Sequence, residues 1–357
     1  MIAALIELGG SHDECLYSQV RFLREKGYRV HMICTANLKQ QVSGFDGVDE
    51  FLFFDFKGVS KLKSMAYLLQ IRKHILKNNI AQVIFNTAEG NLVRNLTLLP
   101  FPKRVQFSGI IHNSYKLLKS SSQRIISRKI KKYFVLNDYI LKHVHSNSKI
   151  AVEAFYPIFF PHFKTIDIPK ADGELWVCIP GQIAFKRRDY EGFLNALIQH
   201  PPKPGIKYIV LGRENDPDRK FSDMVTAAGL QDHFVLFDKF IPNELFHSYL
   251  LQSDIILPLL HPALPKFEQY KKYKITGALN LAFSYRKPLL CKDQFQHVPD
   301  LQENALFYDL EHLGETLNRL PELLPTIVPQ LYQNPKWEFK MQQQRYINFI
   351  EQPLPKL

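Results

Sequence analysis

The chain has 357 residues, a formal net charge of +12 at pH 7 and a hydrophobic fraction of 46%. This length is sufficient for two domains with complete cores, and the composition is that of an ordinary globular protein. Four widely spaced cysteines, at positions 15, 34, 178 and 291, match neither a disulfide framework nor the ligand spacing of a zinc site.

The sequence gives no sign of a targeting or membrane-spanning segment. The apolar run at residues 2–8 has no basic leader and is too short for the core of a signal peptide. Nowhere do ~18 or more uncharged apolar residues follow one another, as a spanning helix requires. We therefore expect a cytoplasmic protein.

Strands and helices alternate along the first half of the chain. Expected strands cover residues 2–8, 30–35, 51–56, 81–86, 104–111, 133–136 and 149–154. Expected helices cover residues 11–26, 61–77, 115–131 and 138–145. This alternation predicts a mostly parallel sheet with helices on both faces, and ligands of such sheets bind at the carboxyl ends of the strands.

A proline-rich linker follows, and the alternation then begins again. Pro157, Pro161, Pro169 and the polar residues 172–174 mark the linker. Strands are expected at 175–179, 207–211, 234–237, 253–259, 288–291 and 306–308. Helices are expected at 190–200, 218–228, 243–251 and 276–285, then proline-broken at 311–333, and finally at 337–350. The prediction is an α/β protein of two Rossmann-like domains, 1–165 and 166–335, that face each other across a cleft. A C-terminal helix within 336–357 could cross back to the first domain.

The stretch from Val177 to Tyr190 contains the clearest candidate site. An apolar strand ends at Pro180-Gly181, the cationic cluster Lys186-Arg187-Arg188 follows, and a helix begins soon after. A glycine turn lets the backbone approach a ligand closely, and a helix N-terminus attracts anions. This combination favours a diphosphate ligand over the alternative of a solvated basic turn.

The positive charge is concentrated in the first half. Residues 1–170 contain 25 Lys and Arg against 12 Asp and Glu, whereas the remainder contains 21 against 22. Between 103 and 149 a single acid, Asp138, accompanies eleven cations: Lys103, Arg104, Lys116, Lys119, Arg124, Arg128, Lys129, Lys131, Lys132, Lys142 and Lys149. Such a block indicates an anionic partner, and attraction to an anionic membrane is worth about 1 kcal/mol for each well-placed cation.

A merely solvated face is the alternative explanation of the basic block. Nucleic acid is not expected as a partner, because no nucleic-acid-binding motif is present and aromatic residues are not interleaved with the cations.

Several segments, taken in order, resemble those of GT-B glycosyltransferases. They are Gly9-Gly10 after the first strand, 107–113 with His112, Pro180-Gly181 with Lys186, 208–212, 253–258, and 274–278 followed by Pro288. Their order and spacing are similar to the large retaining family that includes glycogen synthase and many bacterial cell-surface sugar transferases.

The resemblance implies a hexosyltransferase that moves a sugar from a nucleotide-diphosphate-sugar donor to a cell-surface or lipid-linked glycan, with retention of configuration. His112 and Lys186 would be catalytic, and His12 and Glu14 would lie on the acceptor side. The donor would contact Gly9, Gly10, Gly181, Lys186, Arg187, Arg188, Glu268, Lys274, Thr276 and Gly277. As in similar GT-B enzymes, cationic groups would stabilise the leaving diphosphate, so neither a cofactor nor a metal is expected. The enzyme would work as a peripheral protein at the inner membrane face.

One departure concerns two glutamates that the family usually carries in its donor loop, with seven residues between them. Counting back from Pro288 without gaps places Tyr273 and Leu281 in those positions, whereas Glu268 and Thr276 have the same separation farther upstream. Two other functions remain open: a non-hydrolysing nucleotide-sugar epimerase and a non-enzymatic basic membrane-docking protein. An NAD-dependent enzyme is disfavoured because no GxGxxG follows any expected strand.

Overall fold

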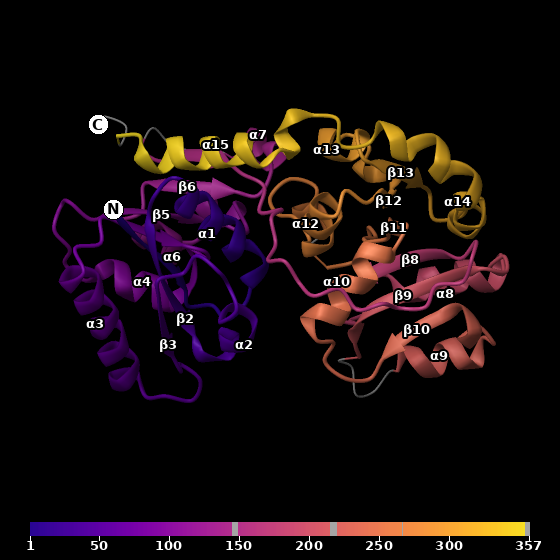
Figure 1. Ribbon diagram of the computed structural model, residues 1–357, viewed down its shortest axis with the longest axis horizontal. Helices are drawn as coiled ribbons and strands as arrows, with labels where there is room; N and C mark the ends of the chain where they lie inside the picture. The colour runs from indigo at the N-terminus through magenta and orange to yellow at the C-terminus, as the bar shows by residue number, and fades with distance from the viewer. Residues whose placement is uncertain (145–148, 215–219, 266, 354–357) are drawn as a thin grey trace. The chain divides into compact units, whose positions relative to one another are not determined.

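The computed structural model describes residues 1–144, 149–214, 220–265 and 267–353, and it divides into two compact units (Figure 1). Unit 1 comprises Met1–Pro161, Lys272–Ile275 and Pro335–Leu357, and unit 2 comprises His162–Lys271 and Thr276–Asn334. We expected a boundary after residue 165, and the first segment of unit 1 extends to Pro161; Lys274, an expected donor contact, belongs to the Lys272–Ile275 segment of unit 1. Each unit has its own parallel sheet, which confirms the α/β architecture.

Unit 1 is built on seven parallel strands in the order β3-β2-β1-β4-β5-β6-β7. The strands are β1 (Ile2–Glu7), β2 (Arg29–Thr35), β3 (Glu50–Phe54), β4 (Gln82–Phe85), β5 (Gln106–Ile110), β6 (Lys132–Val135) and β7 (Ala151–Ala154). The helices are α1 (Leu16–Glu25), α2 (Lys39–Val42), α3 (Lys61–Lys77), α4 (Gly90–Leu98), α5 (Tyr115–Lys119), α6 (Ser121–Ile126), α7 (Asp138–His143) and α15 (Phe339–Glu351). The strand order reverses at β1 and β4, which is where sheets of this kind bind ligands.

The sheet of unit 1 is buried on both faces, so its central strands are continuously apolar. Alternate residues of β1 enter different cores: Ala3 and Leu5 pack on the side of α1 and α15, and Ala4 and Ile6 on the other. Helix α15 completes the first core, since Tyr346 stacks on Phe134 with ring centroids 4.6 Å apart. The C-terminal segment therefore folds as part of unit 1.

Unit 2 is built on six parallel strands in the order β10-β9-β8-β11-β12-β13. The strands are β8 (Leu175–Pro180), β9 (Ile206–Arg213), β10 (Phe234–Phe237), β11 (Ile255–Ile256), β12 (Leu289–Lys292) and β13 (Ala305–Tyr308). The helices are α8 (Tyr190–Gln199), α9 (Phe221–Ala227), α10 (Asn243–Gln252), α11 (Phe267–Tyr270), α12 (Gly277–Ser284), α13 (Pro299–Gln302) and α14 (Leu313–Ile327). Its order reverses at β8 and β11, which places the loop after β8 at the switch point.

Helix α4 was not expected, and three of the expected elements differ in the structure. The single helix expected at 115–131 is divided at Ser120, whose hydroxyl caps α6 by accepting from the Gln123 N–H at 3.2 Å. The strand expected at 253–259 pairs only at Ile255–Ile256. Helix α14 continues through Pro321 and Pro325, because its leucines bury one face in the core of unit 2 and this packing outweighs the lost hydrogen bonds. Within the described residues, no helix combines the length and apolar character needed to cross a membrane.

Candidate functional site

Three polar residues meet at the carboxyl edge of the unit 1 sheet. Glu7 ends β1, Asn86 follows β4, and His112 follows β5 by two residues. These strands are neighbours in the sheet, so their ends lie side by side. The loop after β1, with Gly9 and Gly10, lies at the same edge.

Glu7 holds the glycine loop in place. Its fully buried carboxylate accepts hydrogen bonds from the Gly9 N–H at 2.5 Å, Asn86 Nδ2 at 2.8 Å and Thr87 Oγ1 at 2.6 Å. Burial raises the pKa of Glu7, although these hydrogen bonds oppose the rise. A Cβ at position 9 would lie 2.9 Å from Glu7 Oε1, and Gly10 has a φ of 71°, so the loop requires glycine at both positions.

Asn86 connects the edge to the helices of unit 1. Its Nδ2 also donates to the His12 carbonyl at 2.8 Å, and its backbone carbonyl accepts from His112 Nε2 at 2.8 Å. Its Oδ1 accepts from Gln19 Nε2 at 2.8 Å, and Gln19 Oε1 in turn accepts from the Tyr346 hydroxyl at 3.0 Å. A buried polar chain thus links α15 to the loop that positions the histidines.

The two histidines form a stacked pair. The rings of His12 and His112 are 3.7 Å apart between centroids and 12° from parallel, and His12 Nδ1 lies 3.2 Å from Glu14 Oε1. Burial, together with the charge of His12, lowers the pKa of His112 to about 3, so its ring is neutral at physiological pH. Because Nε2 donates to the Asn86 carbonyl, the lone pair of the neutral ring is on Nδ1.

Neighbouring groups in this cluster have pKa values shifted in opposite directions. Burial alone would lower the pKa of His12, but its hydrogen bond to Glu14 and that carboxylate's charge raise it overall. Burial would raise the pKa of Glu14, and His12 reverses this and lowers it. Burial and the charge of Glu14 raise the pKa of Asp13 to about 6. A carboxyl group that titrates near neutral pH is suited to proton transfer.

The structure thus brings together Gly9, Gly10, His12, Glu14 and His112, all of which were singled out from the sequence. Glu7, Asp13, Asn86 and Glu89 were missed. Glu89 accepts from the Asn113 N–H at 3.0 Å and pairs with Lys116. The sequence does contain a signal for two of these residues: Glu7 and Asn86 are polar residues at the carboxyl ends of apolar strands, where ligands of parallel sheets bind.

In unit 2, the loop after β8 depends on two glycines. Gly181 has a φ of 104°, and its N–H donates to the Leu211 carbonyl at 2.8 Å. Gly212 of β9 lies against this loop so closely that a Cβ there would be 2.7 Å from Gln182 N and closer still to the Gly181 carbonyl. The close approach of these two backbones fixes the start of the cationic loop.

The three cations of this loop are in different environments. The Arg188 guanidinium folds back, with Nη2 donating to the Pro180 carbonyl at 2.5 Å and Nη1 to the Gln182 carbonyl at 3.0 Å. Lys186 and Arg187 are exposed, and within the described parts of the chain neither has a hydrogen-bonding or ion-pair partner. Arg188 therefore shapes the loop, whereas Lys186 and Arg187 are available to an anion.

The two helix N-termini of the expected donor site also differ. Asp189 caps α8 by accepting from the Gly192 N–H at 3.1 Å, so a carboxylate already occupies the helix end that we expected to attract an anion. Thr276 precedes α12, which begins at Gly277 and has no side-chain cap. The N-terminus of α12 is consequently the better of the two for an anionic ligand.

The remaining donor-site candidates belong to different elements. Glu268 is in α11 with its side chain 75% exposed, and it pairs with Lys271 at 3.3 Å. Lys274 belongs to the four-residue segment that packs with unit 1, whereas Thr276 and Gly277 begin unit 2 again.

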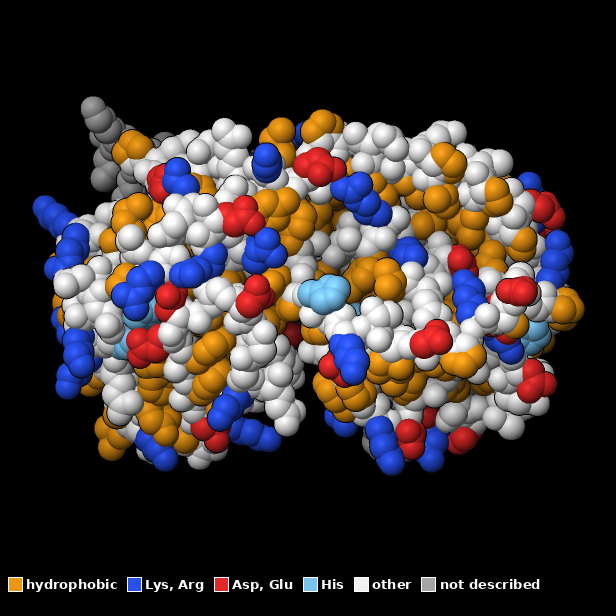
Figure 2. Space-filling model, in the orientation of Figure 1, with side chains coloured by type: hydrophobic (Ala, Val, Ile, Leu, Met, Phe, Trp, Pro, Cys, Tyr) orange, Lys and Arg blue, Asp and Glu red, His pale blue; other side chains and the backbone are white. Residues whose placement is uncertain are grey.

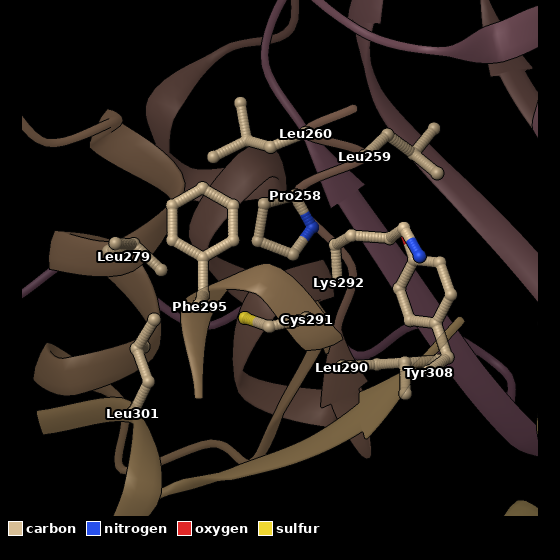
Figure 3. A pocket seen from close by; sticks show the side chains of 10 residues that line it. All are labelled: Pro258, Leu259, Leu260, Leu279, Leu290, Cys291, Lys292, Phe295, Leu301 and Tyr308. Carbon is tan, nitrogen blue, oxygen red and sulfur yellow. The ribbon is translucent and has the colours of Figure 1, made fainter. Parts of the chain in front are cut away.

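An apolar pocket lies at the carboxyl ends of β11 and β12 (Figure 3). Its lining is Pro258, Leu259, Leu260, Leu279, Leu290, Cys291, Lys292, Phe295, Leu301 and Tyr308. Lys292 is the single charged residue of that lining, and its ammonium group lies 6.0 Å from the centroid of the Tyr308 ring. A lining of this kind does not suit a diphosphate.

The basic residues between 103 and 149 all belong to unit 1, and most of them are exposed. On the face of unit 1 in Figure 2, Lys and Arg side chains are spread among apolar and polar ones. Lys132 is an exception to the expected surface block: it is buried, its Nζ donates to the Ile350 carbonyl at 2.9 Å, and burial lowers its pKa. That lysine anchors the C-terminal helix instead of facing a membrane.

No family model and no curated protein matches this chain. Solved structures do match it over nearly the whole length. A glycosyltransferase from Rickettsia africae is 12% identical with a TM-score of 0.63, covering 98% of both chains. A UDP-GlcNAc 2-epimerase from Methanocaldococcus jannaschii is 11% identical with a TM-score of 0.62, covering 98% of this chain and 100% of that one. HepE of Anabaena, in complex with UDP, is 10% identical with a TM-score of 0.64 over 98% of both. The chain therefore has the GT-B fold, which glycosyltransferases and nucleotide-sugar epimerases share.

Proposed function

We propose that this protein is a glycosyltransferase that moves a sugar from a nucleotide diphosphate donor to a cell-surface or lipid-linked glycan. The observation that carries the proposal is the loop after β8, where exposed Lys186 and Arg187 follow Gly181 at the switch point of the unit 2 sheet. The solved structure of HepE with UDP, in the same fold, supports a uridine nucleotide as the first donor to test.

In the proposed reaction, the bond between the sugar and the diphosphate breaks while an acceptor hydroxyl oxygen bonds to the sugar and its proton passes to the leaving diphosphate, on which negative charge grows. Lys186 and Arg187 would stabilise that charge, with the uncapped N–H groups of α12 as a further source of positive potential. In unit 1, neutral His112 would accept a hydrogen bond from a sugar hydroxyl through Nδ1. His12 and Glu14 would contact the acceptor.

The epimerase remains the second candidate, and the histidine–carboxylate cluster of unit 1 is the observation that favours it. Removing a proton from a sugar carbon requires acid–base groups, and Asp13, Glu14, His12 and His112 lie together at one sheet edge. The same groups could instead position an acceptor hydroxyl, so the cluster alone does not exclude a transferase.

A single NMR experiment separates the candidate functions. The protein is incubated with a panel of nucleotide sugars selected by thermal shift, with and without short glycan acceptors, and proton spectra are followed. Sugar transfer predicts release of the nucleoside diphosphate that depends on the acceptor. A new epimer without acceptor would establish the epimerase, and no thermal shift with any nucleotide would favour a non-enzymatic docking protein.

We expect sugar transfer to continue at an unchanged rate in excess EDTA, because cationic side chains are proposed to stabilise the diphosphate. The sequence does contain one Asp-x-Asp triplet, Asp216-Pro217-Asp218, which lies outside the described residues. An Asp216→Asn/Asp218→Asn variant should therefore also retain its rate. Strong inhibition by EDTA, reversed by Mg²⁺ or Mn²⁺, would contradict the metal-independent mechanism.

We also propose that the exposed basic residues between 103 and 149 attach the enzyme to an anionic membrane surface. Reversing the charges of two of them, Arg124→Glu/Arg128→Glu, should weaken binding to phosphatidylglycerol vesicles by at least about tenfold, since each cation contributes about 1 kcal/mol. Vesicle co-sedimentation measures the effect. The matched control is Lys220→Glu/Lys239→Glu in unit 2, which changes the net charge equally.

For the Arg124→Glu/Arg128→Glu variant, sugar transfer to a soluble acceptor should remain unchanged. Equal loss of vesicle binding in both double variants would show that net charge, rather than these positions, controls attachment.

A further inference from the structure

Two histidines and a glutamate from three separate elements converge at the amino end of the unit 1 sheet. His31 lies in β2, Glu50 is the first residue of β3, and His74 lies in the last turn of α3. In the parallel pairing of β2 and β3, His31 and Glu50 are direct partners. Among the described residues this is the one group of at least three His, Cys, Asp or Glu side chains arranged to hold a metal ion.

The distances between the side-chain atoms fit ligands of one metal ion. His31 Nδ1 lies 3.0 Å from His74 Nε2 and 3.4 Å from Glu50 Oε2, and one ligand atom from each of the three side chains lies within 4.8 Å of the other two. Tetrahedral Zn²⁺ has nitrogen and oxygen ligands at about 2.0–2.2 Å, which places pairs of ligand atoms roughly 3.3–3.5 Å apart. The three side chains would need only small adjustments to bind it.

The three residues lie at the edge of the unit 1 core. Both histidines are largely buried, with side-chain exposures of 2% for His31 and 11% for His74. Arg29, Asp49 and Lys77 are the other charged groups that act on the pair. Asn78 Nδ2 donates to the His74 carbonyl at 3.0 Å and lies 3.2 Å from His74 Nδ1, so Asn78 packs against the His74 ring. Glu50 is 46% exposed and provides an entry route.

We propose that His31, Glu50 and His74 bind one divalent transition-metal ion, with Zn²⁺ the first choice and water as the fourth ligand. Two imidazoles and a carboxylate are a ligand set that suits Zn²⁺ and excludes hard ions such as Mg²⁺. The site is at the amino end of the unit 1 sheet, whereas His112 and the glycine loop lie at the carboxyl edge of that sheet, after β5 and β1, so its role is structural. The ion would tie edge strand β3 and helix α3 to β2.

The test uses the full chain after removal of metals with a chelator. Isothermal titration with ZnCl₂ should show one equivalent bound, and the melting temperature should rise because the ion binds the folded state. Co²⁺ should give visible d–d absorption from a low-coordinate site with nitrogen ligands. Glu50→Gln and His74→Gln should each weaken Zn²⁺ binding by about tenfold or more, at least the loss that removal of an outer-shell partner causes.

His312→Gln is the matched control, because it removes a histidine from an exposed pair in which His312 Nδ1 lies 2.8 Å from Asp309 Oδ1. Its Zn²⁺ titration should equal that of the unmodified protein. Should His74→Gln fail to fold, the half-exposed Glu50→Gln decides the outcome. Absence of a one-equivalent site, or equal affinity in Glu50→Gln and the unmodified protein, would overturn the proposal and leave an ordinary His31–His74 hydrogen bond. EDTA should lower the melting temperature without changing the transfer rate, so the two proposals can fail separately.

Discussion

Replacing Lys186 by alanine should lower the turnover number about 10²-fold or more, the loss found when one preorganised group that stabilises transition-state charge is removed. The ammonium group is exposed beside a glycine turn, and within the described residues no acid neutralises it. Because the charge of the diphosphate grows as the sugar leaves, the loss should appear mainly in kcat rather than in KM. Steady-state kinetics with the donor identified by NMR provides the measurement.

Two further variants make this result specific. Lys186→Arg keeps the charge and should retain more activity than the alanine variant. Lys239→Ala removes an exposed lysine from another loop of unit 2 and should leave kcat unchanged. Kinetics of Lys186→Ala that match those of the unmodified enzyme would remove this residue from the mechanism and leave Arg187 as the remaining free cation of the loop.

Replacing Gly212 by alanine should both destabilise unit 2 and reduce activity. A Cβ there would overlap the carbonyl of Gly181 and lie 2.7 Å from Gln182 N, and backbone atoms cannot rotate away as a side chain can. Overpacking of this kind typically costs about 1–3 kcal/mol. In a unit of this size, that cost corresponds to a fall of several degrees in Tm. Calorimetry measures the loss of stability.

The accompanying loss of activity should come from movement of the loop that carries Lys186. Gly44→Ala is the matched control, because no heavy atom lies within 4 Å of its Cβ position and its φ is not positive. It should change neither Tm nor kcat measurably. An unchanged Tm for Gly212→Ala would show that the backbone at Gly212 and the backbone at Gly181–Gln182 are farther apart than in this structure.

The fold was largely predictable because its determinants are local. Continuous apolar runs such as residues 2–6 and 175–179 indicate buried parallel strands, and helical runs between them indicate crossovers. Helix α4 went unrecognised, and the helix expected at 115–131 is divided at Ser120. In both places, whether a helix forms and where it ends depends on one capping residue or on packing against distant parts of the chain. The spacing of apolar residues in the sequence carries no information about either.

The candidate site was predictable in its glycines and charged residues but not in their partners. Gly181 and Lys186 are recognisable because a turn and a cationic cluster follow a strand. The environment of each charged side chain was not predictable. Arg188 donates hydrogen bonds to its own loop, and Lys132 is buried against the C-terminal segment. Both are cations in a basic run, and the sequence offers no means of distinguishing them from their exposed neighbours.

The α/β alternation, the glycine turns and the excess of positive charge in the first half can be read from the amino-acid sequence, since each is a property of neighbouring residues. Which polar groups meet depends on how the chain folds. Glu7 reaches Asn86 because β1 pairs with β4, and His31 meets Glu50 and His74 because strand register and helix packing bring together positions 19 and 43 residues away. Such contacts arise from the free energy of packing the whole unit, which no short stretch of the chain encodes.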